Sequence, residues 1–283
     1  MTQTLLDAGP SERGWHRIET AARCLRLFAW TQVAGKTFPA TEPLIKGSLL
    51  HIGLAHHYAR AQAEQQGTDP DEFYGPHQAV KLLAEKNLKT ATGKEIELWK
   101  SSQPTIHSAL DAYIRRWREQ DKAWEVVEVE TQLKATVRSP ITGKSFLFTQ
   151  RPDLVVKDPH GFHWIVDHKS CYRIATKTLN QHILSGQFLG YTVFGRARWG
   201  NKFGGLVINR VKLSTPHGFD RSSVEPAPAA VTRFAKNLAM MEDRVAQFEG
   251  KPPMEWPAVY SDQVCYGKYG PCPCFELCQW GEE

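Results

Sequence analysis

The chain has 283 residues, which suits one large domain or two small ones. Hydrophobic residues make up 41% and charged residues 23%, an ordinary globular composition, and no stretch approaches the roughly 18 consecutive apolar residues of a membrane helix. The net charge of +5 permits a polyanionic partner without requiring one, and no basic region precedes an apolar run at the start. We therefore expect a cytoplasmic protein that has neither a signal peptide nor a membrane partner.

Helical patterns predominate in the first part of the chain, over about 15–120. Residues 1–14 read as a loose tail, and "DPDEFYGPHQ" reads as a loop. Helical spacing of apolar residues predicts three helices, over about 16–33, 47–67 and 103–120.

Strand patterns take over from about residue 121. Apolar and alternating runs predict strands in "WEVVEVETQLKATV", around "PDLVV", in "FHWIVDHKS" and in "FGGLVINRVKL". "DPHG" is a turn, and helices are expected over about 176–199 and 229–249. The order predicts an α/β fold, a single domain over 1–283. A small mixed β-sheet core at 121–215 would be flanked by helices, with a C-terminal part over 225–283.

Three charged side chains stand at the facing ends of two predicted strands. Asp153 begins one strand, and Asp167 and Lys169 end the next, so an antiparallel hairpin would bring them together. Two close carboxylates repel unless a cation lies between them, and Mg²⁺ typically uses one or two carboxylates. Such a metal activates water for attack on a phosphoryl group, and an ammonium stabilises the same charge. The alternative is a solvated hairpin end with a surface ion pair.

Two further motifs accompany the hairpin. "GSLLH" has the form G-x-x-x-H at the start of a helix and ends in His51. "QFLGY" places Gln187 and Tyr191 four residues apart, on one face of the helix after the strand. A glutamine can hold a base or a phosphate oxygen, and a tyrosine can stack or donate a hydrogen bond. Alone, each motif is compatible with ordinary packing.

In this order, "GSLLH", "RPDLVV", "IVDHKS" and "QFLGY" resemble the RecB-like branch of the PD-(D/E)xK nuclease superfamily, which includes the Cas4 proteins and many phage exonucleases. The resemblance implies a restriction-endonuclease-like core with one or two divalent metals, Mg²⁺ or Mn²⁺. His51, Asp153, Asp167 and the carbonyl of His168 would hold the metal, and Lys169 would act on the water or the phosphate.

The catalytic set implied by the resemblance also includes Gln187 and Tyr191. In the third motif Asp167 stands where glutamate is common in the family, and both are carboxylates. The acidic strand "VEVETQL" precedes the hairpin, as it often does in the family, but we assign Glu130 no more than a supporting position.

Four of the six cysteines lie near the end of the chain: Cys265, Cys272, Cys274 and Cys278. Clustered cysteines in a cytosolic chain point to metal before disulfides. Their spacing is too irregular for a zinc ribbon, and four thiolates can hold either zinc or a [4Fe–4S] cluster. Free thiols in a mobile tail are the alternative. Cys171, directly after the active strand, is interpreted as a buried apolar thiol.

The resemblance implies a choice among these options. Many RecB-like and Cas4-like nucleases carry one cysteine near the N-terminus and three at the C-terminus, all on one [4Fe–4S] cluster. This implies Cys24, Cys265, Cys272 and Cys278 as ligands, with an iron–sulfur-stapled C-terminus. Cys274 is then the spare, and a rival set uses it with Cys272 and Cys278.

The leading functional expectation is a metal-dependent DNA exonuclease in recombination, repair, phage or CRISPR-related processing. It would act on single strands or duplex ends; unwinding would need a helicase or recombination partner, since helicase motifs are lacking. Arg196 and Arg198 are candidates for phosphate contacts. The alternatives are a catalytically idle, iron–sulfur-stapled DNA-binding or scaffold subunit and a zinc-stapled restriction-type endonuclease. Intact Asp153, Asp167 and Lys169 argue against the first alternative, and "QFLGY" argues against the second.

Overall fold

The computed structural model describes residues 3–267 and 270–281, which form two compact units. The first unit comprises the residues up to Ser11, Pro39–Leu133 and Arg151–Val231. The second comprises Glu12–Phe38, Lys134–Gln150 and the chain from Thr232 onward. In the described part of the chain, every helix is too short or too polar to cross a membrane.

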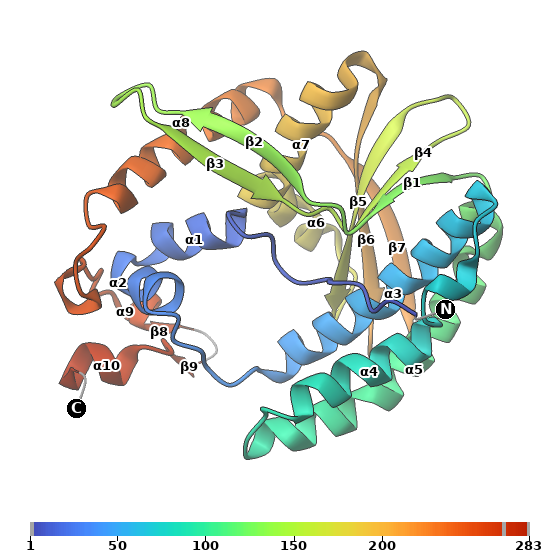
Figure 1. Ribbon diagram of the computed structural model, residues 1–283, viewed down its shortest axis with the longest axis horizontal. Coiled ribbons are helices and arrows are strands. Elements are labelled where there is room, and N and C mark those ends of the chain that lie inside the picture. The colour runs from blue at the N-terminus through green and yellow to red at the C-terminus, as the bar shows by residue number, and fades with distance from the viewer. Residues whose placement is uncertain (1–2, 268–269, 282–283) are drawn as a thin grey trace. The chain divides into compact units, whose positions relative to one another are not determined.

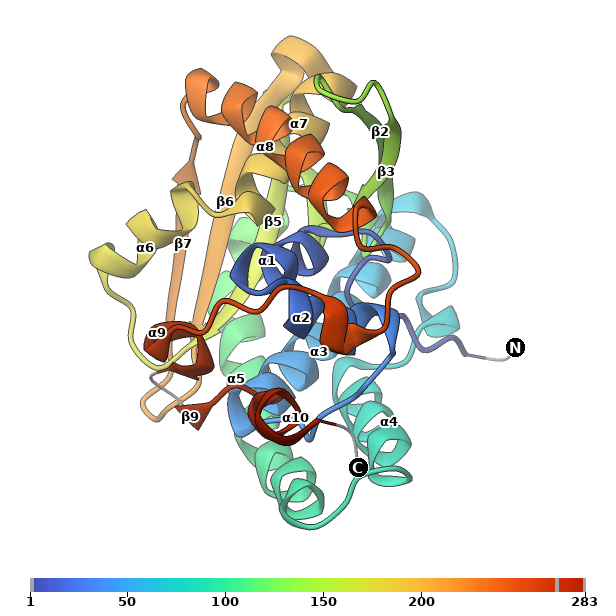
Figure 2. The same cartoon turned by 90° about the vertical axis from the view of Figure 1, so that its left-hand side faces the viewer.

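A five-stranded mixed sheet forms the centre of the first unit (Figure 1). Its strands, in spatial order, are β1 (Glu125–Val129), β4 (Leu154–Lys157), β5 (His163–Cys171), β6 (Phe203–Lys212) and β7 (Gly218–Val224). The β5 and β6 strands pair in parallel, and the other neighbours are antiparallel. Figure 2 shows β6 and β7 side by side over most of their length. The predicted α/β class with a small mixed sheet is therefore confirmed.

The two faces of this sheet pack against different helices. On one side lie α3 (Glu42–Gln66), α4 (Pro76–Leu88) and α5 (Lys94–Asp121), and on the other lies α7 (Gly186–Trp199), preceded by α6 (Thr176–Ile183). Val156 and Val166 pack with the α3–α5 side, whereas Val155 and Ile165 pack with α7. This alternation follows from the period of two in a strand. It explains why the central strands are almost continuously apolar.

Close contact between α3 and α5 depends on a glycine. A Cβ added to Gly53 would lie 2.5 Å from a methyl carbon of Leu110, so a larger residue would push the two helices apart. The α3 helix begins after Thr41, with Pro43 in its first turn, where the missing proline N–H costs no helical hydrogen bond. This packing fixes the helix that carries His51.

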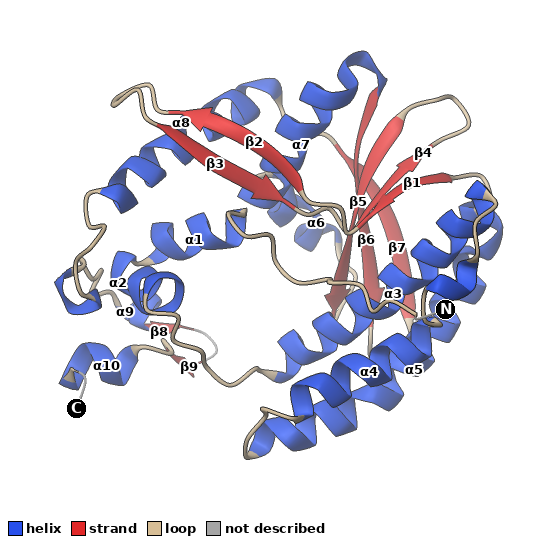
Figure 3. Cartoon of the chain, viewed as in Figure 1, coloured by secondary structure: helices blue, strands red, loops and turns tan. Residues whose placement is uncertain are grey.

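The described residues of the second unit form short helices, two two-stranded sheets and one long helix (Figure 3). Its elements are α1 (Trp15–Arg23), α2 (Leu25–Phe28), a π-helical turn at Ala29–Val33, β2 (Leu133–Arg138), β3 (Ser145–Gln150), most of α8 (Pro228–Ala246), α9 (Asp262–Cys265), β8 (Tyr266–Gly267), β9 (Gly270–Pro271) and α10 (Phe275–Trp280). Leu25, Phe28 and Trp256 belong to its buried core.

The expected antiparallel hairpin of β4 and β5 is confirmed, with Leu154 opposite Val166. The expected loose tail over 1–14 is wrong for the described residues, and its first two residues lie outside them. The backbone N–H of Thr4 donates to the carbonyl of Glu72, and that of Leu6 donates to Nε2 of His56. These contacts tie the start of the chain to α3 and to the loop that follows it.

Several predicted elements are broken where the local backbone departs from regular structure. The helix expected over 16–33 breaks at Cys24, whose φ of −164° is extended. The helix expected over 176–199 breaks before Ser185, whose side chain accepts a hydrogen bond from the N–H of Phe188 and begins a new helix. The strand expected over 124–137 breaks at Glu130, where φ is +50°.

The elements that the sequence-based prediction missed include α4, β3 and β7, and the predicted α5 was too short. The α4 helix begins at Pro76, inside the segment read as a loop. The α5 helix starts at Lys94 and continues through Pro104, a residue that ordinarily ends a helix. The β7 strand, "GFDRSSV", is polar and lacks an alternating pattern, so its pairing with β6 determines its structure.

Candidate active site

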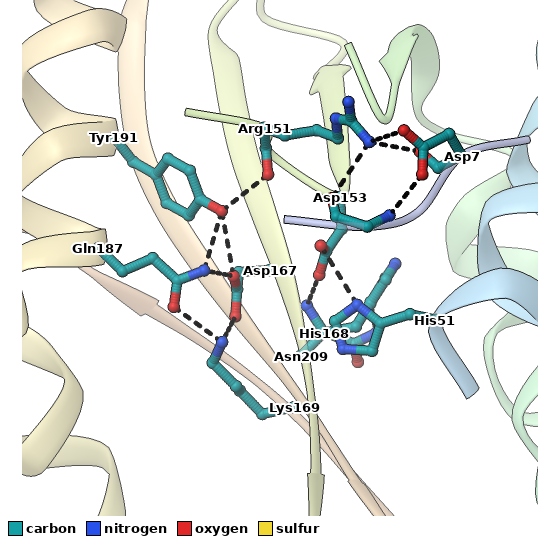
Figure 4. A network of polar contacts seen from close by, with 11 residues as sticks. Asp7, His51, Arg151, Asp153, Asp167, His168, Lys169, Gln187, Tyr191 and Asn209 are labelled. Atoms are coloured by element: carbon teal, nitrogen blue, oxygen red, sulfur yellow. Dashed lines mark hydrogen bonds and ion pairs between the residues drawn. The ribbon is translucent and has the colours of Figure 1, made fainter. Parts of the chain in front are cut away.

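The β4–β5 hairpin brings Asp153 and Asp167 to the same end of the sheet (Figure 4). Asp153 immediately precedes β4, and one of its carboxylate oxygens accepts a 2.6 Å hydrogen bond from the backbone N–H of His168. Asp153 is 8% exposed and Asp167 is 1% exposed. Buried carboxylates of this kind need partners, so the alternative of a solvated hairpin end is wrong.

Lys169 is the direct partner of Asp167. Its Nζ lies 2.8 Å from Oδ2 of Asp167 and donates a 2.9 Å hydrogen bond to Oε1 of Gln187. The amide of Gln187 in turn donates a 2.8 Å hydrogen bond to Oδ1 of Asp167. The three side chains therefore hold one another in a closed arrangement, with Gln187 fixing the positions of both charged groups.

Tyr191 completes this arrangement from the next turn of α7. Its hydroxyl accepts a hydrogen bond from Gln187 and lies 3.1 Å from the carbonyl of Arg151 and 3.4 Å from Asp167. Burial, followed by the charges of Asp167 and Asp153, raises the pKa of Tyr191 well above its ordinary value. Of the roles left open by the sequence, base stacking is excluded because the side chain is buried, and hydrogen-bond donation remains.

A second group of ligand-type side chains lies around Asp153. His51 Nδ1 is 3.3 Å from Asp153 Oδ1, and ligand atoms of His51, Glu130 and Asp153 all lie within 4.8 Å of one another. The backbone N–H of Glu130 donates to the carbonyl of Asp153, which extends the β1–β4 pairing by one residue. Sequence analysis underestimated Glu130; its only sequence signal was an acidic residue at the end of the strand before the hairpin.

The pKa values of the clustered carboxyl groups are those expected of a site that binds a cation. Burial and then the charge of Asp153 raise the pKa of Glu130 well above its usual value. Burial opposes ionisation of Asp153 as well, but His51, His168 and Lys169 together outweigh burial and hold the pKa of Asp153 below its usual value. Burial raises the pKa of Asp167 despite Lys169. Carboxylates this close repel one another, and a divalent cation among them would relieve the repulsion.

His168 contributes to the site through its backbone, while its side chain enters the core. The imidazole stacks on Tyr58 with ring centroids 5.7 Å apart, and its Nδ1 lies 2.6 Å from the amide nitrogen of Asn209. Burial lowers the pKa of His168 to about 3, so the ring is neutral. The peptide groups of residue 168 therefore face Asp153 while the ring packs against α3.

Three other residues singled out in the sequence have surroundings that were not expected. Two are arginines in ion pairs, and one is a cysteine that is less buried than predicted. Arg196 pairs with Glu225, and Arg198 pairs with Glu128 through two hydrogen bonds. A phosphate would therefore compete with a carboxylate at either arginine. Cys171 is the last residue of β5 and is only half-buried, which corrects its interpretation as a buried core thiol.

In the second unit, Cys24 lies with four tail cysteines around one pocket of about 360 Å³. The four are Cys265, Cys272, Cys274 and Cys278. The N–H of Cys272 donates to the carbonyl of Cys265, and hydrogen bonds from Cys274 lower the pKa of Cys272 to about 6. The α9 and α10 helices carry Cys265 and Cys278. The five cysteines therefore lie together in a folded part of the chain.

Comparisons with known proteins bear on the fold and the site together. Among solved structures, a candidate exonuclease from Eubacterium rectale is 12% identical, with 96% of this chain and 88% of that chain covered and a TM-score of 0.48. The protein SSO0001 is 12% identical, with 61% and 85% covered and a TM-score of 0.32. Both likenesses are too weak to carry an argument, and no curated protein matches. The family model described as the PD-(D/E)XK nuclease superfamily matches residues 15–279, a range that includes all four motifs and the hairpin that joins them. The chain therefore belongs to the PD-(D/E)XK nuclease superfamily.

Proposed function

We propose that this chain is a Mg²⁺- or Mn²⁺-dependent deoxyribonuclease that acts as an exonuclease in recombination, repair, phage or CRISPR-related DNA processing. One observation carries the proposal. The buried Asp167–Lys169 pair, fixed by Gln187, lies on the strand paired with β4, next to the group formed by His51, Glu130 and Asp153. Exonuclease action rests on the RecB-like order of the motifs.

The ligand set fits a divalent metal. We assign His51, Asp153, Asp167 and the carbonyl of His168 to the metal, and we add Glu130 because its carboxylate belongs to the same close group. Oxygen-rich sets of this kind suit Mg²⁺ and Mn²⁺. The bound metal supplies an activated water and neutralises charge on the phosphate under attack.

The remaining side chains hold the charged groups in position and stabilise the reacting phosphate. Lys169 places an ammonium beside the reacting phosphate, where it stabilises developing negative charge. Gln187 holds that ammonium by its carbonyl oxygen and holds Asp167 by its amide nitrogen. Tyr191 fixes Gln187 from behind and ties the group to the backbone of Arg151. The hydrogen bonds therefore fix Lys169 and Asp167 before substrate binds.

We also propose a [4Fe–4S] cluster on Cys24, Cys265, Cys272 and Cys278. The pocket that these cysteines share with Cys274 supports a cluster at this place, and the choice of the four rests on the resemblance. The fully buried Cys274 would act through its hydrogen bonds to Cys272. A bound cluster supplies a covalent link between α1–α2 and the end of the chain. That link would stabilise the folded state by restricting the unfolded chain, as a disulfide does.

The nuclease proposal is tested with end-labelled single- and double-stranded DNA in Mg²⁺, Mn²⁺ or EDTA. We expect nucleotides to be released from ends only with a metal, and Lys169→Ala to abolish release. Lys157→Ala is the matched control, because Lys157 also ends a strand of the hairpin and also pairs with a carboxylate, Glu125. Equal activity of the two variants would show that Lys169 is not catalytic.

A further inference from the structure

A second pocket lies in the first unit, beyond the carboxyl ends of the parallel strands β5 and β6. It has a volume of about 520 Å³, and its lining includes Ser170 and Tyr172 at the end of β5 and Ser214 just beyond β6. The first turns of α3 supply Lys46. Ligands of open α/β sheets bind preferentially in the crevice beyond the carboxyl ends of the strands. The volume lies within the range of small-ligand sites.

The pocket is continuous with the catalytic strand and helix. Ser170 directly follows Lys169, and a Cβ added to Gly47 would lie 3.6 Å from the hydroxyl of Ser170, so α3 crosses β5 at this point. Lys46 precedes His51 by five residues, about 7.5 Å along the helix. Tyr172 follows Lys169 by three residues, about 10 Å of extended chain. A group bound here would therefore lie within about 10 Å of Lys169 along the strand.

The chemistry of the lining favours an uncharged, partly apolar ligand. Lys46, the cation among the described residues of the lining, forms an ion pair with Glu42, also in the lining, so the pair carries no net charge. Most of the other polar side chains of the lining, Thr105 among them, are hydroxyls, which can donate or accept at the edge of a base. Among the lining residues that the structure describes, a phosphate would find no unpaired cation, whereas a base would find hydroxyls and apolar surface.

Tyr172 provides the surface for stacking. Its side chain is 76% exposed, and the guanidinium carbon of Arg173 lies 5.8 Å from the centre of its ring. Exposed aromatic rings beside a cation are the usual platform for single-stranded nucleic acid, because each base has a face that can stack. Tyr172 therefore offers an exposed stacking surface at the mouth of this pocket.

We propose that this pocket binds an unpaired nucleobase of the DNA strand adjacent to the scissile phosphate, with Tyr172 stacking on the base. The inference rests on the proposed deoxyribonuclease function and deepens it, because it assigns a site for unpaired substrate. A duplex would have to open at its end to place a base there.

The test uses single-stranded oligonucleotides in which one abasic residue is moved stepwise along the strand. With Tyr172→Ala we expect KM to rise about 5- to 150-fold, the equivalent of about 1–3 kcal/mol for one stacked base. An abasic residue at the pocket position should weaken the parental protein by a similar factor and should weaken Tyr172→Ala no further. Tyr172→Phe keeps the ring and should stay close to the parental value.

Phe162→Ala is the matched control. Phe162 immediately precedes β5 as Tyr172 immediately follows it, it is 36% exposed, and it too has a cation, Lys202, over its ring. If the two alanine variants behave alike, or if the abasic residue weakens Tyr172→Ala as much as the parental protein, the pocket assignment is wrong.

A readout without cleavage separates this inference from the proposed function. Oligonucleotides with 2-aminopurine at the pocket position should lose fluorescence on binding in Ca²⁺, because stacking quenches that base, and Tyr172→Ala should abolish the change. A protein that never cuts DNA but shows this Tyr172-dependent quenching would refute the nuclease and support the pocket. A protein that cuts DNA with equal quenching in both variants would refute the pocket alone.

Discussion

Glu130 combines two costs in the folded, metal-free chain, and they can be separated by substitution. Its φ of +50° lies in the left-handed region, which costs a residue with a Cβ about 1–2 kcal/mol. Its half-buried side chain lies beside Asp153, and partial loss of water together with the charge of Asp153 raises its pKa well above 4.5. Glu130→Gly should remove both costs, whereas Glu130→Gln should remove only the second.

The backbone part of the gain can be estimated. Relief of about 1–2 kcal/mol is offset by the greater entropy that a glycine loses on folding, about 0.5–1 kcal/mol. Glu130→Gly should therefore exceed Glu130→Gln in stability by about 0 to 1.5 kcal/mol. For a chain of this size that corresponds to a rise in Tm of up to about 6 °C.

The carboxyl part depends on pH. A folded-state pKa above 4.5 means that the folded chain binds more protons than the unfolded chain, so stability falls as the pH rises from 4.5 through the folded-state pKa. Glu130→Gln should escape that loss. In EDTA it should be more stable than the parental protein near neutral pH, and the difference should vanish below pH 4.5. The advantage of the glycine variant over the glutamine variant should persist at both pH values.

Thermal unfolding in EDTA, followed at the two pH values, measures both parts. Added Mg²⁺ should then raise the Tm of the parental protein by mass action and should raise that of either variant less, because a ligand has been lost. DNA cleavage should fall in both variants. A glycine variant that melts below the glutamine variant at both pH values would refute the strain argument. If Mg²⁺ raises the Tm of the glutamine variant as much as that of the parental protein, Glu130 is not a metal ligand.

Three further predictions concern the neighbouring groups. Lys169→Met leaves the buried Asp167 without its ion-pair partner, so DNA cleavage should stop. The free energy of unfolding, measured with urea, should fall by less than the roughly 3–5 kcal/mol lost when a fully buried pair is broken, because Lys169 is 27% exposed. Tyr191→Phe removes one hydroxyl and should lower kcat about tenfold with KM unchanged, as for one hydrogen bond of about 1.4 kcal/mol; an unchanged kcat would make the hydroxyl structural. Cys24→Ser should lose the iron of anaerobically purified protein, whereas Cys274→Ser should keep it; the reverse result would support the rival ligand set.

The sequence predicted the catalytic hairpin because its signals are local. A turn at "DPHG" between two apolar runs fixes which residues face each other, so Asp153 and Asp167 could be placed at one end of the sheet. The spacing of Gln187 and Tyr191 similarly fixed their shared helix face, and their hydroxyl–amide distance of 3.0 Å confirms it. These arguments needed only the periods of strands and helices.

The parts that were missed depend on contacts between distant residues. Glu130 lies opposite Asp153 because β1 pairs with β4, and local sequence patterns do not predict this pairing. The β7 strand is a strand because β6 offers it a free edge. Burial of Tyr191 follows from the packing of α7 on the sheet. Periodicity could not distinguish a tyrosine that stacks on a base from one that donates a hydrogen bond into the protein.

The backbone and the side chain of His168 have different surroundings, and this has a consequence for engineering the protein. The peptide groups of residue 168 serve Asp153 and the proposed metal, while the ring fills space between Tyr58 and Asn209 on the other side of β5. Any residue that keeps the extended backbone preserves the peptide groups. The ring also lies edge-on to His51, with ring centroids 6.2 Å apart, so a substitution at position 168 would alter the thermal tolerance of the protein and the packing of a proposed metal ligand together.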